Sequence, residues 1–380
     1  MNASTSGTDR IRVLVVDDSA FIRRLMTDIL ASDADIEVIG TAADAYKARD
    51  AIKQLNPDVI TLDVEMPGMD GIQFLSNLMR LRPMPVVMCS TLTEHGASVT
   101  LEALELGAVD FVQKPTAFNN DVLAEYRSEV TAKVKAAAGA MVRGRTSSGP
   151  RRKFAATAEI PTVAEKHTAD VILAKTPVRA MMPTEPIIAI GASTGGTEAI
   201  RQVLADLPAD SPAVVIAQHI PKAFSGPFAR RMDQCCAMSV CEATDGEIVR
   251  PGHVYIAPGD RHLLLVREGG RYLTRLSDGP PVQRHKPSVD VLFRSVAQAA
   301  GPNAVGVMLT GMGRDGADCM LELREAGAAN IAQDEATSVV WGMPGAAYAA
   351  NAVHSLHPLQ DIAAKILQLA AAQGRPRRVS

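Results

Sequence analysis

Short apolar runs alternate along the chain with segments whose apolar residues recur at helical spacing. Phe21, Leu25 and Ile29 show that spacing, because side chains three or four positions apart share one face of a helix. Alternation of strands and helices favours parallel pairing, so the pattern predicts an α/β fold in both halves of the chain. The strands predicted in the first half cover residues 12–16, 59–62, 86–89 and 110–113. Those predicted in the second half cover residues 187–190, 213–217 and 304–309.

The periodicity is lost between residues 139 and 185, where Pro, Ser, Thr and Ala gather. Such composition is typical of a linker that is partly flexible and partly extended. With 380 residues, the chain is long enough for two domains, each with its own core. We therefore expect a first domain over residues 10–130, a linker over 131–184 and a second domain over 185–375.

The linker region is also rich in positive charge. Between residues 130 and 158 there are seven basic side chains and no acidic one: Lys133, Lys135, Arg143, Arg145, Arg151, Arg152 and Lys153. Such a run is either an electrostatic docking strip for an acidic partner or an anionic membrane surface, or simply a solvated tether.

Polar residues follow each predicted strand of the first half. Asp17 and Asp18 follow the first strand, Asp63 the second, Ser90 the third and Lys114 the fourth. Because the strands are expected to be parallel, these ends should gather at one edge of the sheet. Carboxylates packed together repel each other unless a cation lies among them, and an all-oxygen site suits Mg²⁺. The lysine and the hydroxyl would stabilise an added phosphoryl group.

A glycine-rich turn that carries one serine follows the strand over residues 187–190. Residues 191–196 have the sequence Gly-Ala-Ser-Thr-Gly-Gly, and a helix is predicted over 198–207. The hydroxyl of Ser193 would then lie exposed beside free N–H groups at a helix N-terminus, which suits acyl transfer. Glycine-rich strand–turn–helix segments also bind nucleotide pyrophosphates, so the turn alone leaves both uses open.

Two further strand ends favour acyl transfer. His219 follows the strand over 213–217, where a dinucleotide-binding domain usually has an acidic residue, and Asp315 lies in the loop after 304–309. Ser193 would act as nucleophile, His219 as general base and Asp315 as the group that orients the imidazole. Each residue also has a plainer interpretation: a helix N-cap, a hydrogen-bonded strand-end histidine and a turn residue, respectively.

The first-half motif, Asp17, Asp18, Asp63, Ser90 and Lys114-Pro115, resembles that of response-regulator receiver domains over about residues 10 to 130. The resemblance implies a flavodoxin-like, five-stranded parallel sheet with Asp63 as phosphoacceptor and a chemotaxis histidine kinase as phosphodonor. It further implies that Mg²⁺ is held by Asp18, Asp63 and the main-chain carbonyl of Glu65. The residues implied as the switch that reports phosphorylation are Asp17, Ser90, Phe111 and Lys114.

The second half, with its motifs at residues 191–196, 218–221, 254–259 and 311–316, resembles the chemotaxis protein-glutamate methylesterases. This implies a phosphorylation-activated enzyme that hydrolyses glutamate methyl esters and deamidates glutamines on methylated chemoreceptors. Ser193, His219 and Asp315 would form its triad, without a cofactor. The backbone N–H groups of Thr194 and Met312 are candidates for the oxyanion hole.

The sequence also supports expectations about the fold of the second half and, through the long linker, about its regulation. We expect a doubly wound, mostly parallel α/β domain, with a return strand near Ile331-Ala332 or within residues 263–276. We also expect the unphosphorylated receiver to inhibit the esterase.

Charge and hydropathy argue against other classes. Lys and Arg number 39 against 42 Asp and Glu, so the net charge of −3 gives no field that attracts nucleic acid. The second half is too long for a helix-turn-helix effector, and a nicotinamide-dependent reductase would need an acidic residue after 213–217. There is no apolar run that spans a bilayer and no signal core, so we expect a cytoplasmic protein that is not inserted in the membrane.

Overall fold

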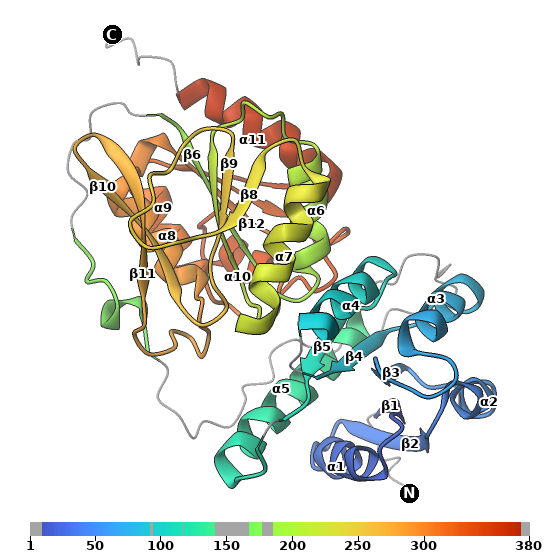
Figure 1. The fold of residues 1–380 in the computed structure, drawn as a ribbon. Helices are drawn as coiled ribbons and strands as arrows, with labels where there is room; N and C mark the ends of the chain where they lie inside the picture. Colours follow the sequence, from blue (N-terminus) through green and yellow to red (C-terminus); the bar gives the residue numbers. More distant parts are fainter. Residues whose placement is uncertain (1–9, 92–93, 116, 141–166, 177–184, 374–380) are drawn as a thin grey trace, which may run out of the picture. The chain divides into compact units, whose positions relative to one another are not determined.

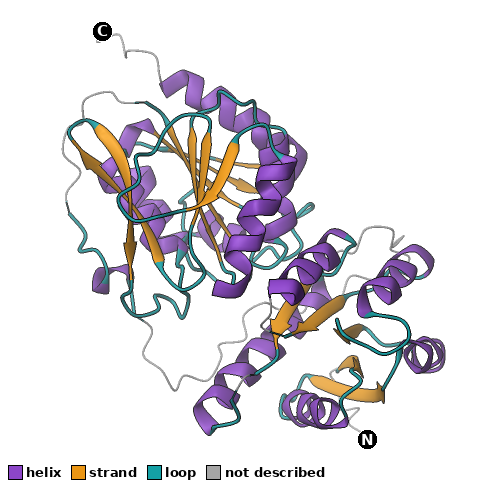
Figure 2. Cartoon of the chain, in the orientation of Figure 1, coloured by secondary structure: helices purple, strands orange, loops and turns teal. Residues whose placement is uncertain are grey.

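The chain divides into two compact units, residues 1–160 and 161–380 (Figure 1). The computed structural model describes residues 10–91, 94–115, 117–140, 167–176 and 185–373. Within each unit the largest sheet lies at the centre and the helices lie outside it (Figure 2).

The first unit contains one parallel sheet of five strands in the order β2-β1-β3-β4-β5. The predicted five-stranded parallel sheet is therefore confirmed. Its strands are β1 (Ile11–Val16), β2 (Ile36–Ala42), β3 (Val59–Asp63), β4 (Val86–Ser90) and β5 (Asp110–Gln113). Its helices are α1 (Ala20–Ala31), α2 (Ala45–Leu55), α3 (Gly71–Leu81), α4 (Glu94–Glu105) and α5 (Asn120–Gly139).

Helix α5 extends the first unit beyond residue 130. Val130, Val134 and Ala137 are buried, which holds this part of the helix on the unit. Lys133 pairs with Glu129 at 2.8 Å, and Lys135 pairs with Asp33 and Asp35, also at 2.8 Å. Two of the seven basic side chains thus neutralise acids of the same unit, and the other five lie outside the described residues.

The second unit contains a sheet of seven strands in the order β14-β13-β12-β6-β7-β9-β8, and every pairing in it is parallel. A hairpin of β10 and β11 forms a separate two-stranded sheet. The strands are β6 (Ile187–Ala192), β7 (Ala213–Gln218), β8 (Ser239–Glu242), β9 (His253–Ile256), β10 (His262–Glu268), β11 (Arg271–Ser277), β12 (Ala304–Met308), β13 (Ala329–Gln333) and β14 (Ser355–His357).

Helices cover both faces of this sheet, so the doubly wound prediction is confirmed (Figure 1). On one face lie α6 (Gly196–Ala205), α7 (Lys222–Cys235) and α11 (Leu359–Gln373). On the other lie α8 (Val289–Ala299), α9 (Ala317–Glu325) and α10 (Met343–Ala349), and two short 3₁₀ turns are η1 (Ala169–Val171) and η2 (Gly301–Asn303). None of the described helices is long and apolar enough to cross a membrane.

The prediction of a return strand that runs antiparallel within the large sheet is wrong. Ile331 and Ala332 lie in β13, which pairs in parallel with both β12 and β14. The antiparallel pair within residues 263–276 exists, but it packs beside α8 instead of joining the large sheet. Strand β13 is only five residues long and is buried beyond its first residue, and so short a run does not reveal strand direction.

Residues 167–176, within the expected linker, lie against α8 of the second unit. The Arg294 guanidinium donates to Asp170 Oδ1 at 2.8 Å and to Leu173 O at 3.0 Å. Gln298 Nε2 donates to Ala174 O at 2.8 Å. The expected domain boundaries themselves stay predictions.

Candidate active site and phosphorylation site

Three loops at the carboxyl ends of neighbouring strands bring Ser193, His219 and Asp315 together. Ser193 directly follows β6, His219 directly follows β7, and Asp315 lies in the loop after β12. Because β6 pairs with both β7 and β12 in parallel, all three loops leave the same edge of the sheet.

The three side chains form a line of short contacts. His219 Nδ1 lies 3.1 Å from Ser193 Oγ, and His219 Nε2 lies 2.8 Å from Asp315 Oδ2. The N-cap of α6 is Gly195, whose φ of +74° favours glycine, and no side chain caps this helix. The plainer interpretation of Ser193 as a helix N-cap is therefore wrong.

Gly311 allows the loop after β12 to approach the serine. A Cβ atom at this position would lie 2.9 Å from Ser193 Cβ and 2.4 Å from the sulfur of Met343. The Ser193 N–H in turn donates to Thr310 O at 3.0 Å. The glycine is thus required by the close packing of two loops that carry site residues.

Asp315 is buried and surrounded by donors from the start of α8. Its Oδ1 accepts hydrogen bonds from Ser288 Oγ at 2.8 Å and Asp290 N at 3.1 Å. Its Oδ2 accepts from Val289 N at 2.7 Å besides its contact with His219. Burial by itself raises the pKa of this carboxyl group, but the hydrogen bond and charge of His219, with the charge of His285 and the Val289 N–H, lower the pKa to about 2. Asp315 is therefore ionised at neutral pH.

One histidine at this site was not distinguished from the others by sequence. The ring of His285 stacks on that of His219, with centroids 3.7 Å apart and planes 12° from parallel. The stack depends on the turn before His285, in which Gln283 and Arg284 have positive φ. No spacing rule predicts that conformation, so the sequence holds no signal for this contact.

The candidate oxyanion donors lie in the same two loops as the nucleophile and Asp315. Thr194 follows Ser193 and is buried, and Met312 follows Gly311. No acceptor for the Met312 N–H lies among the residues that the structure describes.

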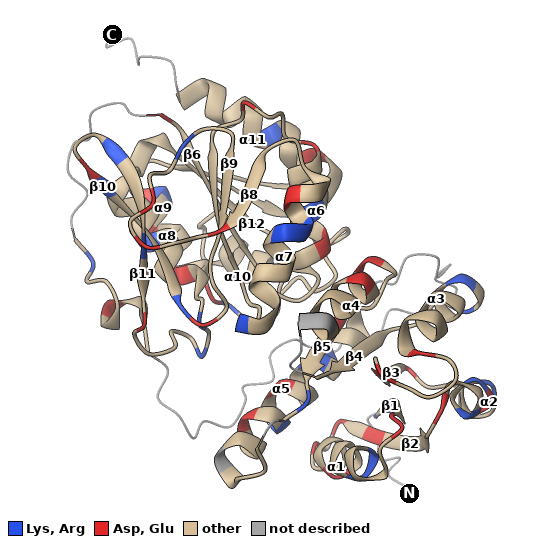
Figure 3. Cartoon of the chain, in the orientation of Figure 1, with Lys and Arg blue, Asp and Glu red and all other residues tan. Residues whose placement is uncertain are grey.

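The polar residues predicted at the edge of the first unit also come together. Lys114 Nζ lies 2.8 Å from both Asp17 Oδ2 and Asp63 Oδ2, and for these two buried oxygens Lys114 is the sole partner within the described residues. Carboxylate oxygens of Asp17, Asp18 and Asp63 lie within 4.8 Å of one another. Acidic residues are seen after β1 and β3 in Figure 3. Three carboxylates with one ammonium fit a divalent cation that prefers oxygen ligands.

The pKa of the Asp63 carboxyl group is raised by its surroundings. Burial raises the pKa of its carboxyl group to about 6, and the charge of Asp17 adds to this, although Lys114 and the Glu65 N–H act in the opposite direction. The Glu65 N–H lies 3.3 Å from Asp63 Oδ1. The charge of Asp63 is thus incompletely compensated.

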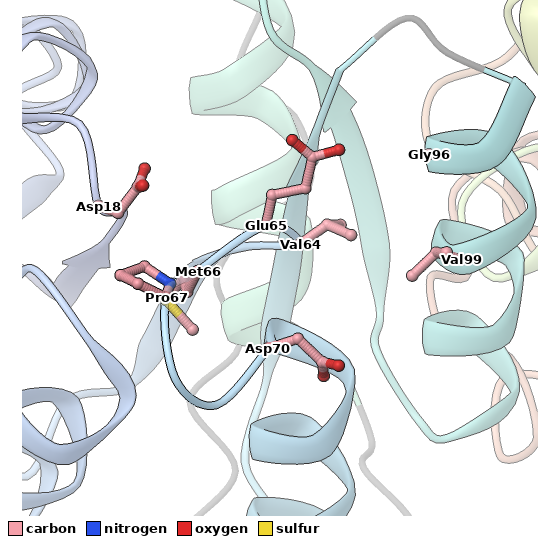
Figure 4. Close-up of a pocket in the computed structure, with 8 residues that line it drawn as sticks. All are labelled: Asp18, Val64, Glu65, Met66, Pro67, Asp70, Gly96 and Val99. Atoms are coloured by element: carbon pink, nitrogen blue, oxygen red, sulfur yellow. The ribbon is translucent and has the colours of Figure 1, made fainter.

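A cavity of about 440 Å³ opens beside these carboxylates (Figure 4). Asp18, Glu65 and Asp70 lie around it, with Gly96 and Val99 of α4 on the far side. The other lining residues are Val64, Met66 and Pro67. The cavity therefore lies at the acidic edge of the sheet.

The implied switch residues lie on β4 and β5. Ser90 is buried, and its Oγ donates to Thr91 O and Gly96 O, both at 3.3 Å. Phe111 is buried as well, with Lys133 Nζ 5.0 Å from its ring centroid. Their role in a switch stays a prediction.

Comparison with known proteins identifies the family of both units. Residues 188–366 match the CheB methylesterase family, and residues 13–125 match the response regulator receiver domain. A protein-glutamate methylesterase/protein-glutamine glutaminase of Xanthomonas euvesicatoria is 55% identical over 361 residues, which cover 95% of this chain and 98% of that protein. One from Hydrogenovibrio crunogenus is 53% identical over 371 residues, with 95% and 99% covered. The crystal structure of the Thermotoga maritima CheB methylesterase catalytic domain is 35% identical, covers 49% of this chain and 99% of its own, and has a TM-score of 0.48.

The two relatives match this chain through both units and nearly end to end, at more than half of the aligned positions. The chain therefore belongs to the protein-glutamate methylesterase/protein-glutamine glutaminase family, with a response regulator receiver domain in its first half.

Proposed function

We propose that this protein hydrolyses glutamate methyl esters, and deamidates glutamines, on chemoreceptors, by means of Ser193, His219 and Asp315. The observation that carries the proposal is the continuous line from Ser193 Oγ through both ring nitrogens of His219 to the Asp315 carboxylate. This arrangement has the nucleophile, base and orienting carboxylate that acyl transfer requires.

The ionised Asp315 selects the tautomer of His219. A carboxylate only accepts hydrogen bonds, so Nε2 must carry a proton and Nδ1 has its lone pair directed toward Ser193. His219 Nδ1 then takes the hydroxyl proton while Ser193 Oγ bonds to the ester carbon. As the carbon–oxygen bond to the methoxy group breaks, His219 returns the proton, and methanol leaves.

The second half of the reaction regenerates the enzyme. Water gives a proton to His219 Nδ1 and bonds to the acyl carbon, and Ser193 Oγ leaves with that proton. The product is a glutamate side chain. A glutamine substrate follows the same steps, with ammonia leaving in place of methanol.

The backbone N–H groups of Thr194 and Met312 are proposed as the oxyanion donors. Both groups belong to loops at the carboxyl edge of the sheet, those after β6 and β12. Each would stabilise the tetrahedral intermediate by about 3–4 kcal/mol, because such a donor acts in a site that excludes water.

In the receiver, Asp63 is proposed to accept a phosphoryl group from a chemotaxis histidine kinase. Asp18, Asp63 and the Glu65 carbonyl would hold Mg²⁺, which supplies positive charge that offsets the carboxylates and the incoming phosphoryl oxygens. Lys114 would move from its pairing with Asp63 to the phosphoryl group, and Ser90 and Phe111 would respond. Phosphorylation is proposed to raise the esterase rate.

Methanol release from a chemoreceptor cytoplasmic fragment with labelled glutamate methyl esters tests the catalytic proposal. Ser193→Ala should lose nearly all activity because the triad acts as a unit. Ser239→Ala is the matched control, since Ser239 is exposed in the edge strand β8. Retention of more than a few per cent of the wild-type rate by Ser193→Ala would assign the nucleophile elsewhere.

A further inference from the structure

Gln218 occupies the last position of β7, next to His219, and its side chain is buried. Its Nε2 donates to two main-chain carbonyls, that of Ser193 at 2.9 Å and that of His219 at 3.1 Å. One amide group therefore joins the backbone of the proposed nucleophile to the backbone of the proposed base. This connection is separate from the contact between the imidazole and the hydroxyl.

The orientation of this amide is determined by its neighbours. Both partners are carbonyl oxygens, which only accept, so the nitrogen must face them. The other end of the amide is left poorly satisfied: Gln218 Oε1 is buried and has no hydrogen-bond partner among the described residues. A buried acceptor without a partner destabilises the fold, so stability alone does not favour glutamine here.

The surroundings of Gln218 leave space for its amide and for little else. A Cβ atom at Gly196 would lie 2.2 Å from Gln218 Oε1, so the amide occupies the volume that this glycine leaves open. Gly196 N also donates to Ser193 O at 2.7 Å. The Ser193 carbonyl is thus held by two donors, one from the turn and one from the neighbouring strand end.

We propose that Gln218 is a positioning residue, whose amide fixes the Ser193 loop relative to the His219 loop and so sets the distance between Ser193 Oγ and His219 Nδ1. The inference rests on the proposed function, because it assigns Gln218 a part in the Ser193 reaction. A small displacement of a nucleophile from its base lowers the rate of reaction and leaves substrate binding almost unchanged.

The chain contains a matched control for this amide. Asn330 is also buried, its Nδ2 donates to Met320 O at 2.7 Å and Ala352 O at 2.9 Å, and its Oδ1 is buried without a partner in the described part of the chain. It likewise lies against a glycine, because a Cβ atom at Gly306 would lie 2.5 Å from Asn330 Oδ1. Asn330 lies near the beginning of β13, whereas the triad follows the ends of the strands.

The first experiment removes each amide in the full-length protein while nearly keeping its volume. Gln218→Met should lower kcat for methanol release from the methylated receptor fragment by about tenfold to a hundredfold, with KM changed less than about twofold. Asn330→Leu loses an equivalent pair of hydrogen bonds and should keep kcat per folded molecule within about twofold. Thermal unfolding of both variants reports how much of each is folded.

The second experiment uses pH to restore one donor, and it applies if Gln218→Met does not fold. In Gln218→Glu the introduced carboxyl group donates one hydrogen bond when protonated and none when ionised, and burial favours the protonated form. The ratio of kcat for this variant to kcat for the wild type should therefore fall as pH rises and be lowest on the alkaline side. In Asn330→Asp the same ratio should stay flat.

The outcomes separate this inference from the proposed function. If Ser193→Ala is inactive but Gln218→Met and Asn330→Leu have equal kcat per folded molecule, the positioning role is wrong and the triad stands. A ratio for Gln218→Glu that recovers at alkaline pH would also overturn it, because a carboxylate that acts only by stabilising the protonated imidazole of His219 loses its effect once that imidazole is deprotonated. If Ser193→Ala stays active, the failure lies with the proposed function.

Discussion

Asp63 and Asp315 are two buried aspartates at the carboxyl ends of two parallel sheets, and their pKa values move in opposite directions. Burial raises the pKa of Asp63 to about 6, whereas the donors around Asp315 lower its pKa to about 2 despite burial. Both side chains are almost entirely inaccessible to solvent. The degree of burial therefore does not explain the difference.

The difference comes from the number and kind of donors around each carboxylate. Asp315 accepts from a hydroxyl, an imidazole and two N–H groups at the first turn of α8. Asp63 has the Lys114 ammonium, which it shares with Asp17, and one long contact with an N–H group. The negative charge of Asp315 is therefore balanced by protein donors without a ligand. The charge of Asp63 would be balanced only by a bound cation or removed by a chemical modification.

The strongest test of this comparison is to remove the charge of Asp315 and keep its shape. Asp315→Asn should lower kcat for methanol release by on the order of 10⁴-fold, because an amide that donates to Nε2 stabilises the wrong tautomer of His219. Asp318→Asn, an exposed change in the same segment, should leave kcat unchanged. An Asp315→Asn enzyme within tenfold of wild type would show that the completed carboxylate is not needed to orient the base.

The two pKa shifts predict opposite effects of pH on stability. Asp315, with a lowered pKa, stabilises the fold above its unfolded pKa of about 4, and this stabilisation is lost as pH falls toward 2. Asp63, with a raised pKa, does not destabilise the fold below pH 4, where its carboxyl group is protonated. The destabilisation of the fold grows as pH rises to about 6 and is complete above that. The raised pKa of Asp63 corresponds to a destabilisation of about 3 kcal/mol.

Amide hydrogen exchange in β1 and β3 measures the Asp63 effect within the receiver. In the presence of EDTA, Asp63→Asn should protect these strands more than wild type at pH 8, and the gain should nearly vanish at pH 4.5. The exposed Asp50→Asn change should show no such dependence. Equal gains at both pH values would contradict the raised pKa of Asp63.

Sequence predicted the position of both sites because each depends on one rule. The ends of parallel strands share an edge, so Asp17, Asp63 and Lys114 could be expected to meet although the first and the last are 97 positions apart. The same rule predicted that the loops of Ser193, His219 and Asp315 would lie together. The position of strand β2 was not predicted, because the strand is half-exposed and has no continuous apolar run; only its terminal residues Ile36 and Ala42 are buried.

What sequence could not predict depends on loop conformation and on side-chain packing. The stack of His285 on His219 requires positive φ at Gln283 and Arg284, residue types that do not signal such a turn. The amide of Gln218 reaches two carbonyls only because Gly196 leaves space for it. The donors of Asp315 other than His219 come from the N-cap and first turn of α8, which begins 26 residues earlier in the chain and has no pattern that marks Asp315 as its target.

The incomplete site of the receiver should respond to a small phosphodonor. Acetyl phosphate with Mg²⁺ should label Asp63 and raise the esterase rate by about tenfold, which corresponds to about 1.4 kcal/mol between the less active and more active states. Asp63→Asn should abolish both the label and the stimulation but keep the basal rate, and EDTA should do the same to the wild type. Label that persists in Asp63→Asn would move the phosphoacceptor to another residue.

The smallest effect is expected when Asp315 loses one of its four donors. Ser288→Ala removes the hydroxyl at 2.8 Å from Oδ1 but keeps His219 Nε2 and both N–H groups in place. We expect kcat to fall only about two- to fivefold, and stability to fall by about 1.5–3 kcal/mol, the contribution of a hydrogen bond to a charged group. Because the pKa of Asp315 should rise toward its ordinary value, the loss of stability in acid should begin at higher pH than in the wild type.

Ser295→Ala is the control for this change. Ser295 is a buried serine of the same helix that accepts a hydrogen bond from Leu265 N and donates one to Leu292 O, so its loss should lower stability without moving that acid transition. If Ser288→Ala leaves the acid transition unmoved, the low pKa of Asp315 rests on the two histidines and the helix amides.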